Sequence, residues 1–453
     1  MPNLARSRVS RTVWWAAPVL VSGILVVLGY LWKASCAAPG QQLGIVDVTA
    51  RMCVNDIAGL WSARGLADHQ FPYLHAVFTA PQGLTGAVEY PVLGGMLIWL
   101  VGLAANDVLS FLTLNSILLG ICAMVATVLL RGLAGRRVWL WAAAPAVLIY
   151  VVYNWDTATV VAATAAFAAL ALGRRGAAAP TVASMITAGA LLGLGGALKV
   201  YPLLLLLPLM LALLHQARIA GSPLVVQLRR AAIPPVAAAV VLLASNLPIM
   251  IISFPGWLTP ILFQSHRELR EDTMSIWYWI LRPFGHPDSE RIQPVVNAAT
   301  LTITAVVIVA VLIVGWRLAN RRGRFPLLAV SLAVVSAYIV FGKVSSPQYI
   351  LWLIPLMAVV AVRARWVVAL YVVDALMFTA WYQMFGQSAL HPDLSRAFQL
   401  TVAICVFLRA GLIVFIAIRA LTVDSQPWPQ WRSASARASE APKLVRAPEE
   451  VVV

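Results

Sequence analysis

Three acidic residues lie next to apolar segments of the chain, at positions where a carboxylate could move a proton. Asp56 stands in "VNDI", Glu89 in "VEYP" and Asp156 in "YNWD". A single loop carboxylate is usually solvated or caps a helix. Three carboxylates that different segments bring to one membrane face instead favour a polar site, in which one of them acts as a general base or orients a hydroxyl group. We expect Asp56, Glu89 and Asp156 to line this site.

Two lysines are candidates for binding an anion. The chain has 33 basic residues, but only Lys33, Lys199, Lys343 and Lys443 are lysines. Lys199 in "ALKVYP" and Lys343 in "GKVSSPQY" end apolar runs on the face where the positive-inside rule disfavours cations. Snorkelling to the interface is the alternative explanation. The pattern predicts point charges for a lipid phosphate.

A third polar segment, "SHRELREDTMSIWYW", combines a histidine with arginines. If it is helical, the spacing of His266 and Arg270 places both side chains on one face. A solvated amphipathic loop helix would also give this pattern. The alternative is phosphate recognition by Arg267 and Arg270, with His266 near the reacting groups.

The elements that must position these residues are membrane helices. Of the 453 residues 61% are hydrophobic and 11% are charged. Long apolar runs without strand-like alternation predict an all-α integral membrane protein, because a helix satisfies its own backbone groups in lipid. The net charge of +16 is carried by short arginine clusters between the apolar runs, which indicates cytoplasmic loops and no nucleic-acid partner.

The runs predict about twelve transmembrane helices within residues 14–418, with both termini cytoplasmic. The expected crossings are 14–32, 108–130, 138–153, 157–173, 182–200, 201–217, 231–253, 296–318, 326–342, 350–362, 366–386 and 397–418. Residues 33–91 then form a long first external loop and residues 254–295 another. We expect residues 92–106 to be interfacial or re-entrant, residues 1–13 to be a cytoplasmic N-terminus and residues 419–453 to be a disordered cytoplasmic tail.

Two pairs of residues have a structural interpretation. Cys36 and Cys53 share the external loop, where a disulfide can persist, so we expect a bridge that shortens the loop. Asp374 and Arg409 lie at similar depth in the last two crossings. They should form an ion pair inside the membrane, because a lone charge there would be costly.

Common enzyme motifs are absent: the sequence has no phosphate-binding glycine loop, HExxH, Cys/His metal spacing or GxSxG. The ordered set "VEYPVLGG", "YNWD", "GLGGALKVYPLLLLLP", "SHRELREDTMSIW" and "SSPQYILWLIPL", after an aspartate in the first loop, resembles glycosyltransferase family 87 of the GT-C superfamily. The resemblance covers about residues 50–360. The arginine- and alanine-rich, lysine-poor composition is similar to that of actinobacterial proteins.

This resemblance implies a GT-C-type multi-helix bundle with its active site at the external membrane surface. It implies a polyprenyl-phosphate sugar as donor and a glycolipid or envelope polysaccharide as acceptor, with transfer of mannose or arabinofuranose in lipoglycan and cell-envelope biogenesis. Asp56 matches the catalytic aspartate of the first loop, although Val54-Asn55 replaces the usual hydroxyl-bearing residues before it. Some members of the superfamily use a metal, so the sequence leaves a divalent metal open, with no ligands fixed.

The chemistry of such a transfer assigns roles to the remaining polar residues. The cations should lie near the phosphate and the base near the acceptor hydroxyl. The residues expected to bind substrate are Glu89, Tyr90, Asp156, Lys199, Tyr201, Arg267, Arg270, Lys343, Gln348 and Tyr349, with Asp56 and His266 as catalytic residues. The expected reaction is a single displacement that inverts the anomeric centre. A lipid-linked sugar transporter is the competing interpretation, but transporters place polar sites near the midplane between repeated halves, and no repeat is evident.

Overall fold

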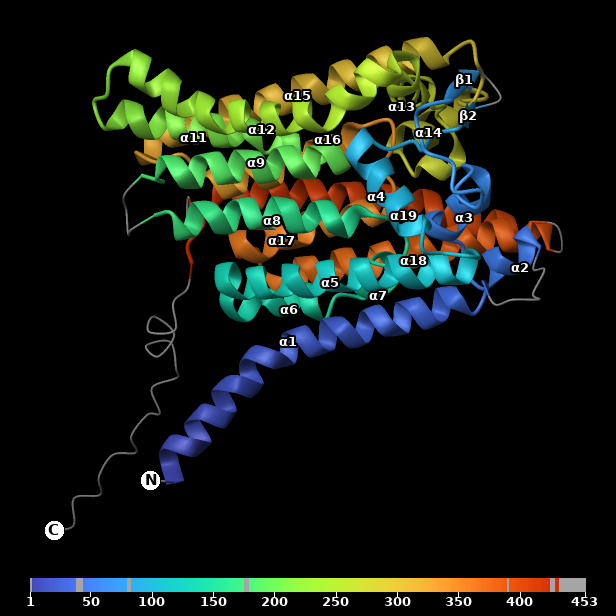
Figure 1. The fold of residues 1–453 in the computed structure, drawn as a ribbon, viewed down its shortest axis with the longest axis horizontal. Helices are drawn as coiled ribbons and strands as arrows, with labels where there is room; N and C mark the ends of the chain where they lie inside the picture. The colour runs from blue at the N-terminus through green and yellow to red at the C-terminus, as the bar shows by residue number, and fades with distance from the viewer. Residues whose placement is uncertain are drawn as a thin grey trace.

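The computed structural model is a bundle of helices that lie side by side along its long axis (Figure 1). It describes residues 2–37, 44–79, 83–174, 179–388, 391–423 and 428–431. The first half contains α1 Pro2–Ala34, α2 Ile45–Ala50, α3 Asp56–Ala63, β1 Val77–Thr79, β2 Gly83–Thr85, α4 Val92–Gly102, α5 Val108–Ala134, η1 Gly135–Val138, α6 Trp139–Ala142, α7 Pro145–Tyr150, α8 Asp156–Leu172, α9 Val182–Leu198, α10 Tyr201–Leu204 and α11 Leu206–Ile219. The second half contains α12 Leu224–Ile252, α13 Phe254–His266, η2 Glu271–Thr273, α14 Ile276–Leu281, η3 Arg282–Phe284, α15 Gln293–Arg322, α16 Leu327–Phe341, η4 Pro347–Tyr349, α17 Ile350–Val360, α18 Ala364–Gln387 and α19 Pro392–Thr422.

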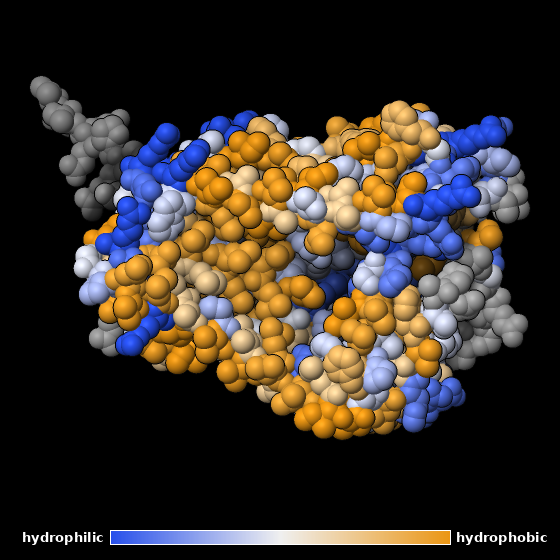
Figure 2. Space-filling model, turned by 90° about the horizontal axis from the view of Figure 1, so that it is seen from above, coloured by the Kyte–Doolittle hydropathy of each residue, from blue (hydrophilic) through white to orange (hydrophobic). Residues whose placement is uncertain are grey.

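The prediction of an all-α integral membrane protein is confirmed. Among the described residues, 7 helices are long and apolar enough to cross a membrane, and shorter apolar helices accompany them. Figure 2 shows an apolar surface between two more hydrophilic ends. Such an outward-facing apolar belt is what a helical bundle presents to lipid.

Most of the expected crossings coincide with helices, but one does not. Each of the 7 long helices falls on an expected crossing, and the shorter helices α8, α9, α16 and α17 fall on four more. The crossing expected at 138–153 is instead broken into η1, α6 and α7. Pro145 begins α7, and Ala144 before it is extended. Proline disfavours the helical conformation of the preceding residue, which explains the break.

One end of the bundle carries most of the short elements, and we call it the hairpin end. It contains α2, α3, α13, α14 and the hairpin in which β1 pairs antiparallel with β2, with Phe78 opposite Leu84 (Figure 1). The expected external loops 33–91 and 254–295 supply these elements. The N-terminal end of α1 and the C-terminal end of α19 lie at the opposite end (Figure 1).

Helix α4 occupies the segment expected to be interfacial or re-entrant. It has 11 residues, so at 1.5 Å per residue it spans about half of a bilayer core of roughly 30 Å. It packs against α9, α12 and α5. Close packing at Gly95 explains part of its sequence, because a Cβ there would lie 1.7 Å from the Tyr73 hydroxyl. That α4 does not cross the membrane stays a prediction.

Both expected structural pairs are present. Cys36 and Cys53 form a disulfide that closes a segment of 17 residues. Arg409 Nε lies 2.9 Å from Asp374 Oδ1, and both side chains are buried. The disulfide joins the end of α1 to the segment that precedes Asp56, so it restrains the approach of the chain to α3.

The tail differs from the expected disorder over its described part. Helix α19 continues to Thr422 rather than ending near residue 418. Trp428 is buried, with the Arg174 guanidinium 5.0 Å from its ring centroid. Trp431 packs against Gly132, where a Cβ would lie 2.3 Å from the indole ring. Indole rings bury a large apolar area, which explains why this stretch of the tail packs against the bundle. Residues 424–427 and 432–453 lie outside the described part.

Candidate functional site

A cavity of about 1120 Å³ opens at the hairpin end of the bundle. Its walls come from segments far apart in the sequence: α3, the turn before α4, the turn before α8, the α9–α10 bend, α12, α13, the start of α15 and η4. Figure 2 shows a hollow with hydrophilic residues at its bottom, surrounded by apolar surface. A pocket of this size that combines apolar walls with convergent polar groups is typical of a ligand site.

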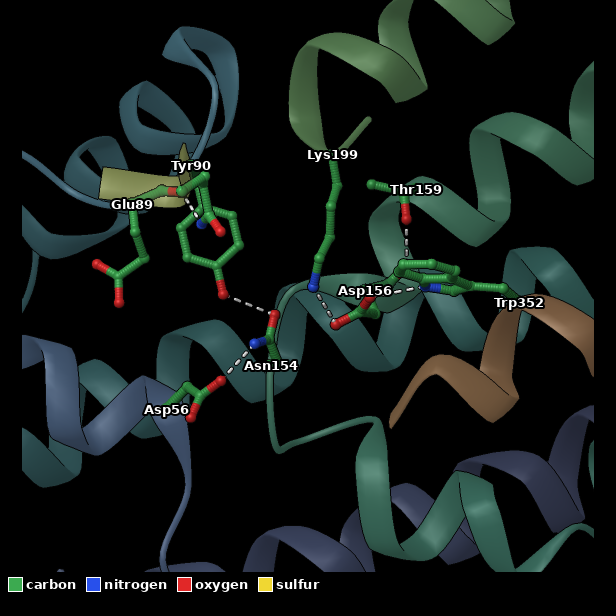
Figure 3. Close-up of polar contacts among 9 residues, drawn as sticks. Asp56, Glu89, Tyr90, Asn154, Asp156, Thr159, Lys199 and Trp352 are labelled. Carbon is green, nitrogen blue, oxygen red and sulfur yellow. Dashed lines mark hydrogen bonds and ion pairs between the residues drawn. The ribbon is translucent and has the colours of Figure 1, made fainter. Parts of the chain in front are cut away.

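Asp56 is the first residue of α3 and faces this cavity. Asn55 caps the helix, with its side chain accepting from Ala58 N at 2.8 Å. The Asn154 amide donates a hydrogen bond to Asp56 Oδ2, and the Tyr90 hydroxyl donates to Asn154 Oδ1 at 2.9 Å (Figure 3). The carboxylate is therefore held by a chain of two side chains, and only one of its oxygens is bonded in this way.

The environment of Asp56 changes its acidity. Burial raises the pKa of this carboxyl from 3.8 to about 6, partly offset by the hydrogen bond from Asn154 and the positive charges of Lys199 and Arg267. Protein surrounds the group closely although part of its surface faces the cavity, so little water solvates the charged form. A carboxylate with a pKa near 6 is a better proton acceptor at neutral pH than an ordinary aspartate.

Lys199 forms the second polar centre of the cavity. It ends α9 in an extended conformation, and Nζ lies 2.8 Å from Asp156 Oδ2 (Figure 3). Asp156 is fully buried, and its other oxygen accepts from Trp352 Nε1 at 2.7 Å. The sequence pattern predicts that Asp156 contacts the substrate. The structure instead puts it behind Lys199, where it neutralises part of the lysine charge and fixes its position.

Aromatic rings surround the Lys199 ammonium. Its Nζ lies 5.6 Å from the centroid of Tyr90, 5.3 Å from that of Tyr349 and 5.7 Å from that of Trp352. Trp352 is stacked between Tyr201 at 4.3 Å and Tyr349 at 3.9 Å. Ring faces attract cations, so this arrangement holds the ammonium at one place on the cavity wall.

Glu89 lines the cavity but is already paired. Its Oε2 lies 3.0 Å from Arg64 Nε, and its side chain is partly exposed. Gln264 of α13 donates to its backbone oxygen at 3.0 Å. The pair ties α3 to the turn before α4 and leaves Glu89 Oε1 available to a ligand hydroxyl. Figure 3 shows Glu89 on the same side of the site as Asp56 and Tyr90.

The segment from His266 to Arg270 lines the cavity, but the expected helical arrangement is wrong. Helix α13 ends at His266, and the chain runs without helix to η2. Leu269 is fully buried in a second apolar cluster, and Gln293 Oε1 accepts from its backbone N–H at 2.9 Å. Leu269 is therefore anchored in a stretch that is not helical, and His266 and Arg270 share no helix face. Within the described residues, no carboxylate lies at ion-pair distance from the guanidinium of Arg267 or Arg270.

His266 has local hydrogen-bond partners. Its Nδ1 lies 2.9 Å from Leu262 O and 3.1 Å from Ser265 Oγ, and its ring contacts Phe78 at 5.2 Å between centroids. The hairpin and the end of α13 therefore form one rim of the cavity.

Lys343 does not line the cavity, contrary to the expected contact with substrate. Its ammonium donates to Arg267 O and, at 2.6 Å, to Asn297 Oδ1. Burial and the nearby Arg267 lower the pKa of Lys343 to about 8. The lysine thus holds the backbone that carries Arg267.

The structure brings together most of the residues predicted from the sequence. The cavity is lined by Asp56, Glu89, Tyr90, Lys199, Tyr201, His266, Arg267, Arg270, Gln348 and Tyr349. Asp156 and Lys343 support it from behind. Sequence reasoning missed Asn154 and Trp352 as site residues, although both stand in the quoted motifs "YNWD" and "YILW". In these motifs Asp156 and Tyr349 are the residues with an obvious functional group. Nothing in the spacing indicates that the Asn154 amide reaches Asp56.

The described residues contain no group of three or more His, Cys, Asp or Glu side chains arranged to hold a metal ion. A divalent metal therefore gains no specific ligand set from them.

Comparison with known proteins gives one family. The family model described as "Mannosyltransferase (PIG-M)" matches residues 157–418. Searches of curated proteins and of solved structures give no significant match. Asp56, Glu89 and Asn154 precede the matched segment, so their place in the site rests on the geometry. Lys199, Arg267 and Tyr349 lie within it. More than half of the chain matches, and the chain therefore belongs to the mannosyltransferase (PIG-M) family of membrane glycosyltransferases.

Proposed function

We propose that this protein transfers mannose from a polyprenyl-phosphate donor to a hydroxyl group of a membrane glycolipid or envelope polysaccharide. The family implies a lipid-linked donor and an acceptor in the membrane. The single observation that carries the proposal is the cavity. It is lined by the carboxyl group of Asp56, whose pKa is raised, and by the cations Lys199 and Arg267. These are the two kinds of group that transfer from a sugar phosphate requires.

The proposed reaction is a single displacement. The acceptor oxygen attacks the anomeric carbon, the bond from that carbon to the phosphate oxygen breaks, and Asp56 takes the hydroxyl proton. Phosphate leaves with its electron pair and needs no proton, because Lys199, Arg267 and Arg270 stabilise its charge. Attack opposite to the leaving group inverts the anomeric centre.

The remaining lining residues hold the sugars. Gln348 and Tyr349 lie beside Lys199 and would contact the donor, while Glu89 and His266 lie on the rim where an acceptor would enter. Gln348 lines the cavity, and its amide is a group that would bond a sugar hydroxyl of the donor.

The proposed site faces outward. The arginine clusters at the ends of α5, α8, α15 and α17 lie away from the hairpin end, and the positive-inside rule assigns such clusters to the cytoplasm. We further propose the narrower membership in glycosyltransferase family 87, an actinobacterial source and a role in lipoglycan synthesis, which rest on the sequence resemblance alone.

A transfer assay with defined donors tests the proposal. Purified protein in nanodiscs is incubated with radiolabelled polyprenyl-phosphate mannose or polyprenyl-phosphate arabinofuranose and a lipid acceptor fraction. Transfer of mannose supports the proposal, and transfer of arabinofuranose alone corrects the sugar. If neither sugar is transferred but sealed proteoliposomes move the intact donor between leaflets, the protein is a transporter.

A further inference from the structure

The buried pair Asp374 and Arg409 does more than neutralise charge within the membrane. We infer that Arg409 is a positioning residue that fixes the loop carrying Gln348 and Tyr349 on the wall of the cavity. This inference rests on the proposed function for its link to the donor. That Arg409 holds the loop follows from the contacts of its guanidinium and does not depend on the proposed function.

The guanidinium of Arg409 reaches from the middle of α19 into the loop between α16 and α17. Its NH1 group donates to Ser345 O at 3.2 Å and to Ser345 Oγ at 3.1 Å. Its NH2 group donates to Pro347 O at 3.1 Å. Nε lies 2.9 Å from Asp374 Oδ1. One guanidinium thus holds Ser345 and Pro347, and Pro347 directly precedes Gln348 and Tyr349.

Asp374 joins a second site-bearing segment to the same network. Its Oδ2 accepts from the Tyr150 hydroxyl at 2.7 Å. Tyr150 ends α7, four residues before Asn154, which holds Asp56. One buried ion pair therefore bonds both segments: Asp374 holds the helix end that precedes the turn with Asn154, and Arg409 holds the loop with Gln348.

The contact pattern requires an arginine. A carboxylate partner alone would be satisfied by any cation, but the loop carbonyls need several donors in fixed directions. A lysine ammonium is a single point charge on a flexible stem and cannot reproduce the fork. The loop is also bonded from the other side, since Ser345 N donates to Thr273 O at 2.8 Å. Arg409 on one side and Thr273 on the other therefore fix the position of the loop.

The variant Arg409→Lys separates pairing from positioning, because lysine can still neutralise Asp374. We expect a folded protein in which the KM for polyprenyl-phosphate mannose rises by about tenfold, as expected for loss of charge-assisted hydrogen bonds at a binding loop, while the KM for the acceptor changes little. Amide hydrogen exchange across residues 342–350 should become faster. Ser345→Ala, which removes one acceptor and leaves the ion pair, should shift both readouts in the same direction by a smaller factor.

A purely structural role gives a different result. In that case Arg409→Lys would leave the exchange protection of residues 342–350 and the donor KM at their wild-type values. This result would overturn the inference. Ser345→Ala decides the question if Arg409→Lys does not fold, since unchanged exchange and donor KM in that variant would contradict the positioning role. If the wild type transfers no sugar from either donor, the proposed function fails, and the exchange measurement alone decides whether Arg409 positions the loop.

Discussion

At the scale of single residues, the protonation state of Asp56 links the structure to the reaction. Burial raises its pKa to about 6, and only the ionised carboxylate can accept the proton of the acceptor hydroxyl. The transfer rate should therefore rise with pH through a value near 6 and level off above it. An unperturbed aspartate would give a limb near pH 4.

Asn154 should control the position of this limb. Its amide donates to Asp56 and so stabilises the charged form, which lowers the pKa. In Asn154→Leu the pKa of Asp56 should rise further, and the acidic limb of the pH–rate profile should move to higher pH. Asn246→Leu is a matched control, because Asn246 also lines the cavity but bonds Trp257 rather than Asp56. A limb that stays in place in Asn154→Leu would contradict the role of this amide.

The residue scale also shows what sequence patterns can and cannot predict. Lys199 was recognisable because a cation at the end of an apolar run is unusual, and it does face the cavity. The same signal at Lys343 did not identify a residue of the cavity wall, because a partly buried loop carbonyl attracts an ammonium as well as a phosphate does. Asn154 and Trp352 carry no charge, so only the fold shows that they hold Asp56 and Asp156.

At the scale of elements, a disulfide lies directly before helix α3 and its aspartate. The bridge between Cys36 and Cys53 lies three residues before Asp56, and Tyr382 of α18 donates to Val54 O at 2.9 Å in the same stretch. Closing a loop of 17 residues stabilises a protein by about 3 kcal/mol in the chain-entropy account.

Removing the bridge should therefore affect both stability and activity. The double variant Cys36→Ser, Cys53→Ser should unfold at a lower temperature and transfer sugar more slowly per folded molecule, since Asp56 loses a fixed approach. Cys122→Ser serves as the control, because Cys122 is a free thiol. Equal thermal stability and equal specific activity of the double variant and the wild type would show that the bridge does not position α3.

Elements were predictable where hydrophobic length decides them, and not where local chemistry does. The long crossings follow from their apolar runs, as with α12 and α15. Apolar length does not predict the break around Pro145 or the non-helical stretch after His266. The break depends on the effect of Pro145 on the conformation of Ala144, and the non-helical stretch depends on the hydrogen bond between buried Leu269 and Gln293. Trp428 was assigned to a disordered tail from composition, but its indole ring is buried.

At the scale of the whole molecule, the orientation in the membrane is open to a direct test. Asp288 is exposed at the hairpin end, between η3 and α15, whereas Ser222 lies in the turn between α11 and α12 at the opposite end. A membrane-impermeant thiol reagent should label Asp288→Cys in intact cells and Ser222→Cys only after permeabilisation. The reverse pattern would place the proposed site in the cytoplasm.

The architecture explains how a membrane enzyme could use a lipid-linked sugar. The cavity opens at one end of the apolar belt and has apolar walls from α12 and α13, including Leu242 and Ile261, next to its polar wall. A donor could keep its hydrocarbon chain in lipid while its phosphate meets Lys199 and Arg267. Bundle, belt and site therefore fit the family to which the chain belongs.

The central claim is that Asp56 is the general base of a mannosyl transfer, and one comparison tests it most directly. Wild type, Asp56→Asn and the control Asp68→Asn, an exposed aspartate of the same loop, are assayed in nanodiscs with polyprenyl-phosphate mannose. The account predicts that Asp56→Asn stays folded and loses at least about a hundredfold in rate, the usual contribution of a general base, while Asp68→Asn matches the wild type. A folded Asp56→Asn variant with wild-type transfer would contradict the account.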